Sequence, residues 1–296
     1  MDEPGFTDVS LRASHVAIWG LGLMGGSLAM ALKGKCASLA GVDRTAAVAA
    51  RAVELGIVER ASTDPREILP AVDVIVLATP PRVILSTIAV LPEIVPGKTV
   101  VIDLASTKAQ IAAAFSALPA RIASVGGHPM CGKEKSSLEN ADPEIFIQAV
   151  FALVETRRTT PRARMLGEQL VRAVGSRLLW LDPAEHDRWV AATSHAPFLV
   201  ASALAGATPE EVKPMIGTGF RSTTRIAASS TEMMVDILET NRQNVLEALH
   251  TIQASLANYE QLLQDGAYAA LASQFRAAAD HYQMLTGPSA NDRGVR

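Results

Sequence analysis

Short apolar runs alternate with amphipathic segments over residues 14–181. The runs at 74–78 and 99–103 are almost continuously apolar, which is typical of parallel strands buried on both faces. Helical periodicity lies between the runs, and this alternation predicts a doubly wound, Rossmann-like α/β domain. We expect strands at 15–19, 38–43, 73–78, 99–103, 121–125, 150–154 and 177–181, and helices at 45–54, 83–91, 107–117 and 161–174.

The pattern becomes helical throughout after residue 181. Asp182, Pro183 and Glu185 together form a capping box with proline at the first helical position, a signal that begins a helix. A second capping box at 229–232 predicts a long helix that ends near 265–266. The strand-and-helix region is therefore followed by a region of helices alone.

Four parts follow from these patterns. We expect a disordered tail over 1–13, an α/β domain over 14–181, an all-α domain over 182–286 and a second disordered tail over 287–296. The long helix carries apolar residues at alternating spacings of four and three, which is a heptad seam. Such a narrow stripe packs either within its own domain or against a second subunit, and by analogy with other helical domains that follow a dinucleotide-binding domain we expect a homodimer. The seam residues are Val245, Leu249, Ile252, Leu256, Tyr259 and Leu263.

Glycines mark the end of the first predicted strand. Gly20 permits a tight turn, Gly22 lets the backbone approach a pyrophosphate, and Gly25 lets the following helix pack closely on the sheet. The free N–H groups and the dipole of that helix favour phosphate. Asp43 ends the second strand, where its carboxylate would accept hydrogen bonds from a ribose. This combination predicts a dinucleotide site.

The same residues indicate which dinucleotide is bound. Asp43 would repel the 2′-phosphate of NADP, whereas the neighbouring Arg44 could stack on that phosphate, and on balance we expect NAD. The residues expected to bind the cofactor are Gly20, Gly22, Leu23, Met24, Gly25, Asp43, Arg44, Thr79 and Ser106.

Composition excludes several other classes of protein. The 296 residues are 49% hydrophobic and carry a formal net charge of −3, which gives no footprint for nucleic acid. Cys36 and Cys131 form neither a disulfide framework nor a metal cluster, and this usage fits a reducing cytosol. The acidic start lacks the apolar core of a signal peptide, and no apolar run reaches the length of a membrane span. We therefore expect a cytoplasmic protein without metal, membrane or nucleic-acid partners.

Candidate catalytic residues follow the predicted strands at their carboxyl ends, where open α/β sheets bind their ligands. Thr79 follows one strand, Ser106 another, and His128 lies in a Gly-Gly-His-Pro loop after a third. A histidine in that place is suited to general-base catalysis, although it could equally cap the loop.

The helical region adds two histidines and a basic loop. His186 and His195 are nine residues apart, which on an α-helix places them on opposite faces, so they do not form a metal pair. We expect His186 to be an exposed first-turn residue, and His195 to lie beside the helix proline Pro197 as a ligand or as a buried structural histidine. The glycine- and hydroxyl-rich loop at 217–225 ends in Arg225, whose guanidinium fork would suit a carboxylate, but taken alone it reads as a surface arginine.

Taken together, these segments resemble the prephenate/arogenate dehydrogenase family. The resemblance covers about residues 14–285 and is carried by five blocks in the family's order and spacing, at 20–26, 103–108, 127–135, 193–197 and 219–227. It implies NAD-dependent oxidative decarboxylation of a cyclohexadiene, in which hydride leaves C4, CO2 leaves C1 and the ring becomes aromatic.

The resemblance also implies roles for individual residues. His128 would accept the proton of the substrate hydroxyl, and Ser106 would sit between His128, that hydroxyl and the nicotinamide. Arg225 would bind a substrate carboxylate, and His195, with Ser194 and Lys133, would help to hold the substrate. The sequence departs from the family's common residues at Lys133, Phe198 and Ser222, which leaves open whether the substrate is prephenate, arogenate or an amino-substituted relative.

Two other readings compete with this one. β-Hydroxyacid dehydrogenases share the glycine-rich opening, but they use a lysine in a helix of the second domain, and residues 183–205 contain no lysine. A non-catalytic NAD-binding module would need no base at the strand ends, and His128 with Ser106 argues against that reading.

Overall fold

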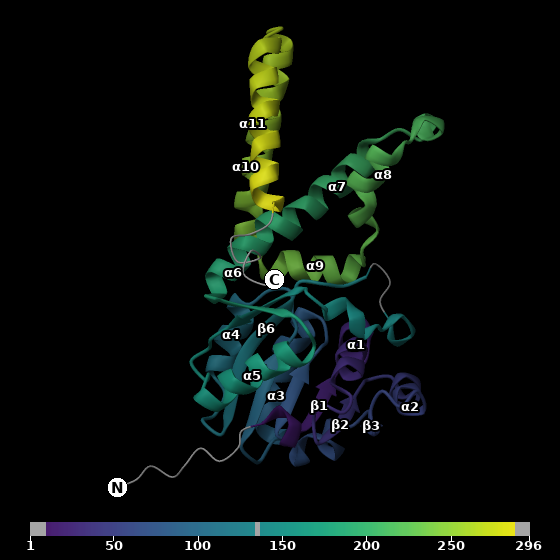
Figure 1. Cartoon of the computed structure of the whole chain (residues 1–296), viewed down its shortest axis with the longest axis vertical. Helices are drawn as coiled ribbons and strands as arrows, with labels where there is room; N and C mark the ends of the chain where they lie inside the picture. The colour runs from purple at the N-terminus through teal and green to yellow at the C-terminus, as the bar shows by residue number, and fades with distance from the viewer. Residues whose placement is uncertain (1–9, 134–136, 288–296) are drawn as a thin grey trace, which may run out of the picture. The chain divides into compact units, whose positions relative to one another are not determined.

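Eight strands form one sheet in the order β3-β2-β1-β4-β5-β6-β7-β8 in a computed structural model of the chain (Figure 1). The structure describes residues 10–133 and 137–287. All neighbouring strands are parallel except β6 and β7, which are antiparallel. The strands are β1 (His15–Trp19), β2 (Ser38–Val42), β3 (Arg60–Ser62), β4 (Val74–Leu77), β5 (Thr99–Asp103), β6 (Ile122–Pro129), β7 (Val150–Val154) and β8 (Arg177–Leu181).

Helices cover both faces of the sheet, because side chains alternate along each buried strand. On β4, Val74 and Val76 face the core beneath α1 and α5, whereas Ile75 and Leu77 face the core beneath α3 and α4. This confirms the doubly wound domain. Its helices are α1 (Leu23–Leu32), α2 (Ala46–Glu54), α3 (Pro81–Ile94), α4 (Ala109–Ser116) and α5 (Pro161–Ala173).

The sixth strand is longer than predicted, and this changes the setting of His128. Residues 122–125 pair with β5, and residues 126–129 continue past it to pair with β7. A Cβ atom at Gly127 would lie 2.6 Å from the Asp103 carbonyl oxygen, so a glycine is required for the strand to pass β5 this closely. His128 therefore lies in a strand paired with Ala152, and its predicted place in a loop was wrong.

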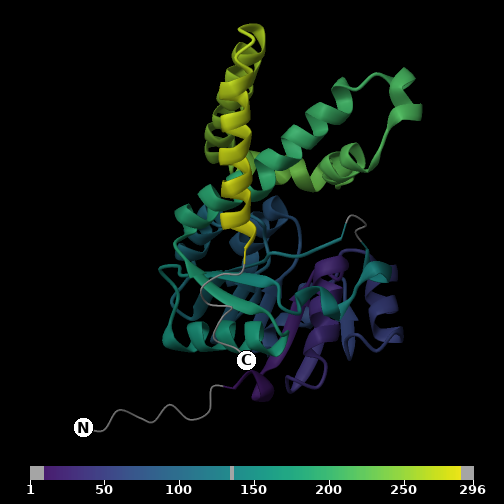
Figure 2. The ribbon, with the colours of Figure 1, turned by 45° about the horizontal axis from the view of Figure 1, so that its top comes forward.

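The chain divides into two compact units, Met1–Val245 and Leu246–Arg296. The first helices after the sheet thus belong with the α/β part, because hydrogen bonds and packing tie them to it, whereas the predicted domain boundary lay at 181/182. These helices are α6 (Pro183–Val190), α7 (Ala196–Ala207), α8 (Thr218–Thr224) and α9 (Thr231–Thr240). A π-helical turn, Ala191–His195, joins α6 to α7, and α7 and α8 lie side by side (Figure 2).

The second unit is a helical hairpin. It contains all but the first residues of α10 (Arg242–Gln264) together with α11 (Tyr268–Thr286), and the rings of Tyr259 and Phe275 lie 5.6 Å apart across it. Seam residues Leu256 and Leu263 remain 57% and 55% exposed. The hairpin thus leaves much of its apolar seam uncovered in a single chain.

Three further expectations need correction. The helix predicted from 229 to 265 is two helices, broken at Asn241. The three-residue strand β3 was not predicted. Residues 10–13, expected in the disordered tail, form a short 3-10 turn with Leu11 buried, and Gly287 caps α11; the rest of both tails lies outside the described residues.

One helical stretch, Pro183–Ala207, is long and apolar enough by composition to cross a membrane. It carries His186 and Asp187, both buried and hydrogen-bonded to the α/β part, so its polar groups are partnered within the protein. Burying such groups in lipid would be costly. The stretch is best explained as a domain helix.

Candidate active site

The turn after β1 has the geometry that a dinucleotide requires. Gly20 has φ +100°, and a Cβ atom at Gly25 would lie 1.8 Å from the Gly20 carbonyl oxygen, so both positions exclude other residues. A Cβ atom at Gly22 would meet no protein atom within 4 Å. Gly22 therefore faces open space at the start of α1, where a pyrophosphate could approach the free N–H groups.

Asp43 stands at the end of β2, beside this turn. Its two carboxylate oxygens accept backbone hydrogen bonds from Leu21, at 2.9 Å, and from Thr45, at 2.9 Å. These bonds fix the carboxylate while leaving lone pairs for a ribose, because each oxygen can accept a second bond. Arg44 is exposed next to it.

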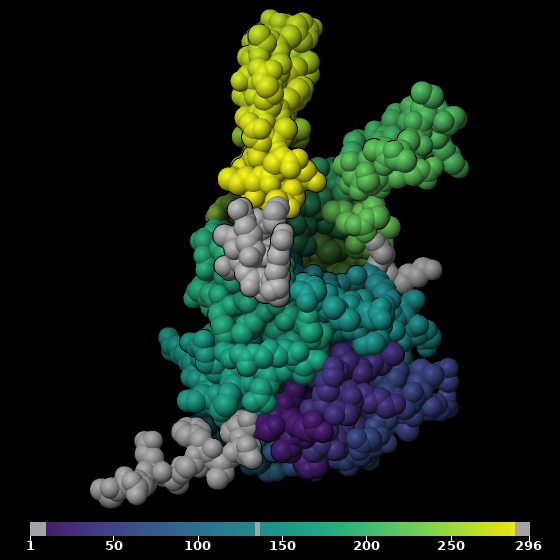
Figure 3. Space-filling model, viewed as in Figure 1, coloured from purple at the N-terminus to yellow at the C-terminus, as the bar shows by residue number. Residues whose placement is uncertain are grey.

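Two cavities adjoin at the carboxyl end of the sheet. The first runs from the glycine turn and is lined by Gly22, Leu23, Met24, Thr79 and Ser106, among others. The second, of about 400 Å³, is large enough for a small molecule. A hollow between the α/β part and the helices that follow it is visible in Figure 3. The two cavities share the residues Ser106, Lys133, Ser229 and Met233.

The second cavity brings together most of the predicted substrate-site residues. His128 and Ser106 come from the sheet side, Ser194 from the π-helical turn, and Arg225 from the end of α8. The π-turn has a structural cause, since Pro197 lacks the N–H that would bond the Thr193 carbonyl in a regular helix. Ser106 thus lies where the two cavities meet.

His195 does not line this cavity. Its ring is 1% exposed, and its Nδ1 lies 3.2 Å from the Asn241 amide nitrogen. Burial lowers the pKa of His195 to about 4, so the ring is neutral and accepts the amide hydrogen. This placement agrees with the buried structural histidine, one of the two roles that the sequence left open.

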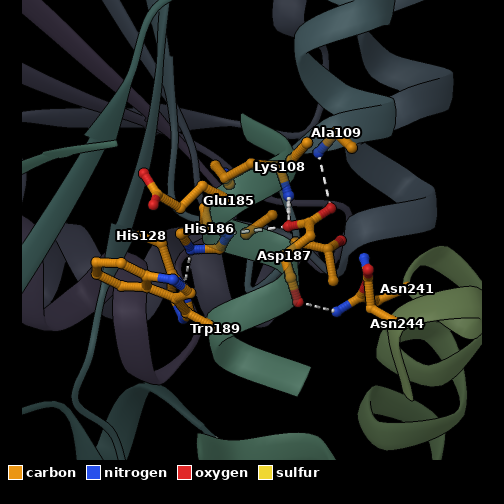
Figure 4. Close-up of polar contacts among 12 residues, drawn as sticks. Lys108, Ala109, His128, Glu185, His186, Asp187, Trp189, Asn241 and Asn244 are labelled. Atoms are coloured by element: carbon orange, nitrogen blue, oxygen red, sulfur yellow. Dashed lines mark hydrogen bonds and ion pairs between the residues drawn. The ribbon is translucent and has the colours of Figure 1, made fainter. Parts of the chain in front are cut away.

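His186 is a site residue that the sequence analysis missed. The sequence predicted an exposed side chain, but His186 is only 1% exposed. Its Nε2 lies 2.9 Å from Nδ1 of His128 (Figure 4). The expected exposure was wrong because α6 packs against α4, which turns the first-turn side chain of His186 toward His128. The position of Asp187 directly after His186 was the available sequence signal for a buried, carboxylate-bound histidine.

Asp187 completes a buried line of polar groups behind His128. One of its carboxylate oxygens lies 2.8 Å from Nδ1 of His186 and accepts the backbone N–H of Lys108 at 2.6 Å. The other oxygen accepts the backbone N–H of Ala109 at 2.9 Å. The Asn241 side chain, between α9 and α10, donates to the Asp187 carbonyl oxygen at 2.7 Å.

The electrostatic setting keeps His128 neutral. Burial, followed by repulsion from His186, Lys108 and His195, lowers the pKa of His128 well below the ordinary histidine value of 6.5. Lys108 is fully buried, pairs with Asp103 and donates to the Gly127 carbonyl oxygen at 2.7 Å, which anchors β6 next to His128. A neutral imidazole at the wall of a cavity can act as a general base.

The three departures from the resembled family occupy different places. Lys133 and Phe198 line the second cavity, and the Lys133 ammonium lies 2.9 Å from an Asp142 oxygen. Ser222 is not among the lining residues described, and its hydroxyl donates to the Gly219 carbonyl oxygen at 3.1 Å. The first two departures can influence substrate choice directly.

Comparison with known proteins finds matches for both the α/β part and the helices that follow it. Residues 28–179 match the family model described as the nucleotide-binding domain of prephenate dehydrogenase, and residues 182–277 match its dimerization domain. The chain is 33% identical over 248 residues to a prephenate dehydrogenase of Bacillus subtilis, which is 78% of this chain and 65% of that protein. The chain thus spans slightly less than two thirds of that relative.

Solved structures agree with this match. A prephenate dehydrogenase from Aquifex aeolicus in complex with hydroxyphenyl propionate and NAD+ has a TM-score of 0.85 and 28% identity, over 93% of this chain and 99% of that one. An arogenate dehydrogenase from Synechocystis has a TM-score of 0.75 and 26% identity, over 90% and 99%. These likenesses confirm a dinucleotide-binding domain followed by a helical domain.

Proposed function

Because the chain belongs to the prephenate dehydrogenase family, we propose that it catalyses the NAD-dependent oxidative decarboxylation of prephenate to 4-hydroxyphenylpyruvate. One observation carries this proposal: Ser106 lines both cavities, and the neutral His128 lines the second of them. A hydride donor in the second cavity would therefore lie next to both a base and a nicotinamide in the first.

The proton transfers of the proposed reaction require such a base. NAD bound along the glycine turn would supply the acceptor for the hydride that leaves C4. His128 takes the hydroxyl proton as C4 becomes a carbonyl carbon, and returns it to the oxygen when loss of CO2 from C1 makes the ring aromatic. Ser106, which lines both cavities, would hydrogen-bond the same oxygen through its hydroxyl.

Cationic side chains in the cavity favour an anionic substrate. Arg225 and Lys133 both line it, and prephenate carries two carboxylates. Arogenate shares the ring and replaces the keto group of the side chain with an ammonium group, which two nearby cations disfavour. The likeness to the Synechocystis arogenate dehydrogenase nonetheless makes arogenate the second candidate.

We also propose that the protein is a cytoplasmic homodimer. The match to a dimerization domain and the exposed apolar seam of α10 support the dimer. Both cysteines are free thiols in the structure, which suits a reducing compartment.

Product analysis tests the proposed reaction. Purified protein is incubated with NAD and prephenate, and NADH, CO2 and 4-hydroxyphenylpyruvate are quantified. We expect the three products in equal amounts. Formation of NADH without CO2 would mean a different dehydrogenase reaction, and turnover of arogenate alone would move the assignment to the second candidate.

A further inference from the structure

Three nitrogen atoms lie within hydrogen-bond distance of the two carboxylate oxygens of Asp187. Two are backbone groups, of Lys108 and Ala109, and the third is Nδ1 of His186. A carboxylate so surrounded acts only as an acceptor. His186 therefore carries its proton on Nδ1, and in the neutral ring Nε2 is a lone pair.

The tautomer of His128 follows from that of His186. Since Nε2 of His186 can only accept, Nδ1 of His128 must be the donor across the 2.9 Å between them. The lone pair of His128 then lies on Nε2, at the ring edge away from His186. The described residues give that nitrogen no hydrogen-bond partner, and the ring lines the substrate cavity.

We propose that Asp187 and His186 are positioning residues that hold His128 in its Nδ1–H tautomer and receive its proton during catalysis. The proposal rests on the proposed function, since it concerns how the same base works. When Nε2 of His128 takes the hydroxyl proton, the Nδ1 proton can move to Nε2 of His186. The positive charge then rests on His186, 2.8 Å from the Asp187 carboxylate, and the reverse shift returns the proton.

The surroundings make this carboxylate necessary. The charged and titratable groups that face the two rings are Lys108, Asp103, His195 and Asp187. Lys108 and Asp103 pair with each other, so Asp187 is the carboxylate left to balance an imidazolium. Burial lowers the pKa of His186, and the hydrogen bond to Asp187 opposes that shift.

Asp187 also links the base to the other half of the site. Its bonds to the backbone of Lys108 and Ala109 hold the start of α4, two residues after Ser106. One carboxylate from α6 thus orients both the histidine that takes the proton and the segment that carries the serine. Losing it should affect catalysis more than substrate binding.

The first test is the tautomer itself, read by nitrogen NMR of labelled histidines in the protein without substrate. We expect His128 and His186 both as neutral Nδ1–H rings. An Nε2–H ring at His128 in the wild-type protein would overturn the proposal. Since this reading needs no turnover, it stands apart from the proposed function, which fails if neither prephenate nor arogenate is oxidised.

The second test uses Asp187→Asn and His186→Gln. An asparagine can donate to Nδ1 of His186, which reverses the proton order and puts the His128 proton on Nε2, so we expect kcat to fall about 10²–10⁴-fold with KM nearly unchanged. The glutamine of His186→Gln keeps an acceptor for His128 but cannot take a proton. We expect the fall in kcat for this variant to be about tenfold smaller than that for Asp187→Asn.

Thr240→Val is the matched control. It removes another buried hydrogen bond, 2.9 Å long between the hydroxyls of Thr107 and of Thr240 on α9, without touching the histidines. We expect its kcat to stay within about twofold of wild type. A kcat for His186→Gln equal to that of this control would overturn the proposal even if Asp187→Asn failed to fold.

Discussion

At the residue scale, the proposed chemistry depends on the protonation state of His128. Its ring is 8% exposed, and burial lowers its pKa, so the neutral base is the ordinary form of the folded protein. The reference histidine value near 6.5 would place the onset of activity around that pH. The buried setting moves this onset to lower pH.

Activity should therefore rise with pH through a value below 6.5 and be level at neutral pH. The sign follows because only neutral imidazole accepts a proton, and a lowered pKa keeps it neutral to lower pH. The measurement is kcat/KM for prephenate against pH, which reports the free enzyme. A rise centred above 6.5 would mean that His128 is not the titrating base.

Arg225→Ala should raise KM strongly and change kcat less. In the proposed role the guanidinium would contact an anion present in both the ground state and the transition state, so its loss would weaken the binding of both alike. At roughly 1.5–3 kcal/mol for a charged hydrogen bond, kcat/KM should fall about 10- to 150-fold. Arg221→Ala on the same helix, outside the lining residues, is the control. A fall in kcat alone would assign Arg225 to the transition state.

The place of the candidate site could largely be predicted from the sequence, because strand ends and glycine spacing mark it. His128, Ser106 and Arg225 were predicted, and the structure brings them to one cavity. His186 was missed because its burial depends on the packing of α6 against α4 and on the contact with His128, neither of which the helical period encodes.

At the scale of elements, the turn from β1 into α1 makes the cofactor site. Its strand, glycines and helix were predicted, since each obeys a local rule. The break at Asn241 was not predicted, because the apolar spacing runs on across it and neither proline nor glycine marks it. The strand β3 was missed because its three residues are too few to show a periodicity.

Gly22→Ala separates folding from cofactor binding. Its Cβ atom meets no protein atom within 4 Å, so the melting temperature should hold, but the methyl group would stand where a pyrophosphate approaches. We expect NAD affinity, measured by calorimetry, to fall at least tenfold. Gly97→Ala is the control, because its Cβ position is also open but Gly97 does not line the first cavity. It should change neither the melting temperature nor the NAD affinity. Unchanged NAD binding in Gly22→Ala would move the site elsewhere.

At the scale of the whole molecule, the hairpin of α10 and α11 leaves part of its apolar seam exposed, at Leu256 and Leu263. The heptad spacing was visible in the sequence. The sequence of one chain does not show whether the seam packs against its own chain or against a second subunit. Burying a leucine or isoleucine contributes about 1.5–3 kcal/mol, so several on each chain can hold a dimer.

Ile252→Glu should dissociate the dimer. A charge in the seam must lose its water when two chains meet, which is costly without a partner. Light scattering at micromolar concentration should give a dimer for wild type and for Gln253→Glu, its exposed neighbour, and a folded monomer for Ile252→Glu. A wild-type monomer would place the seam within one chain's own core.

The most direct test of the account is the steady-state rate of NADH formation from prephenate by wild type and by His128→Asn. Asparagine fills a similar space but cannot take a proton, so folding and ligand binding should persist. We expect wild type to turn over prephenate in preference to arogenate, and His128→Asn to lose about 10²–10⁴-fold in kcat. An unchanged kcat in His128→Asn would contradict the proposed mechanism, because the base that this mechanism requires would have no part in the reaction.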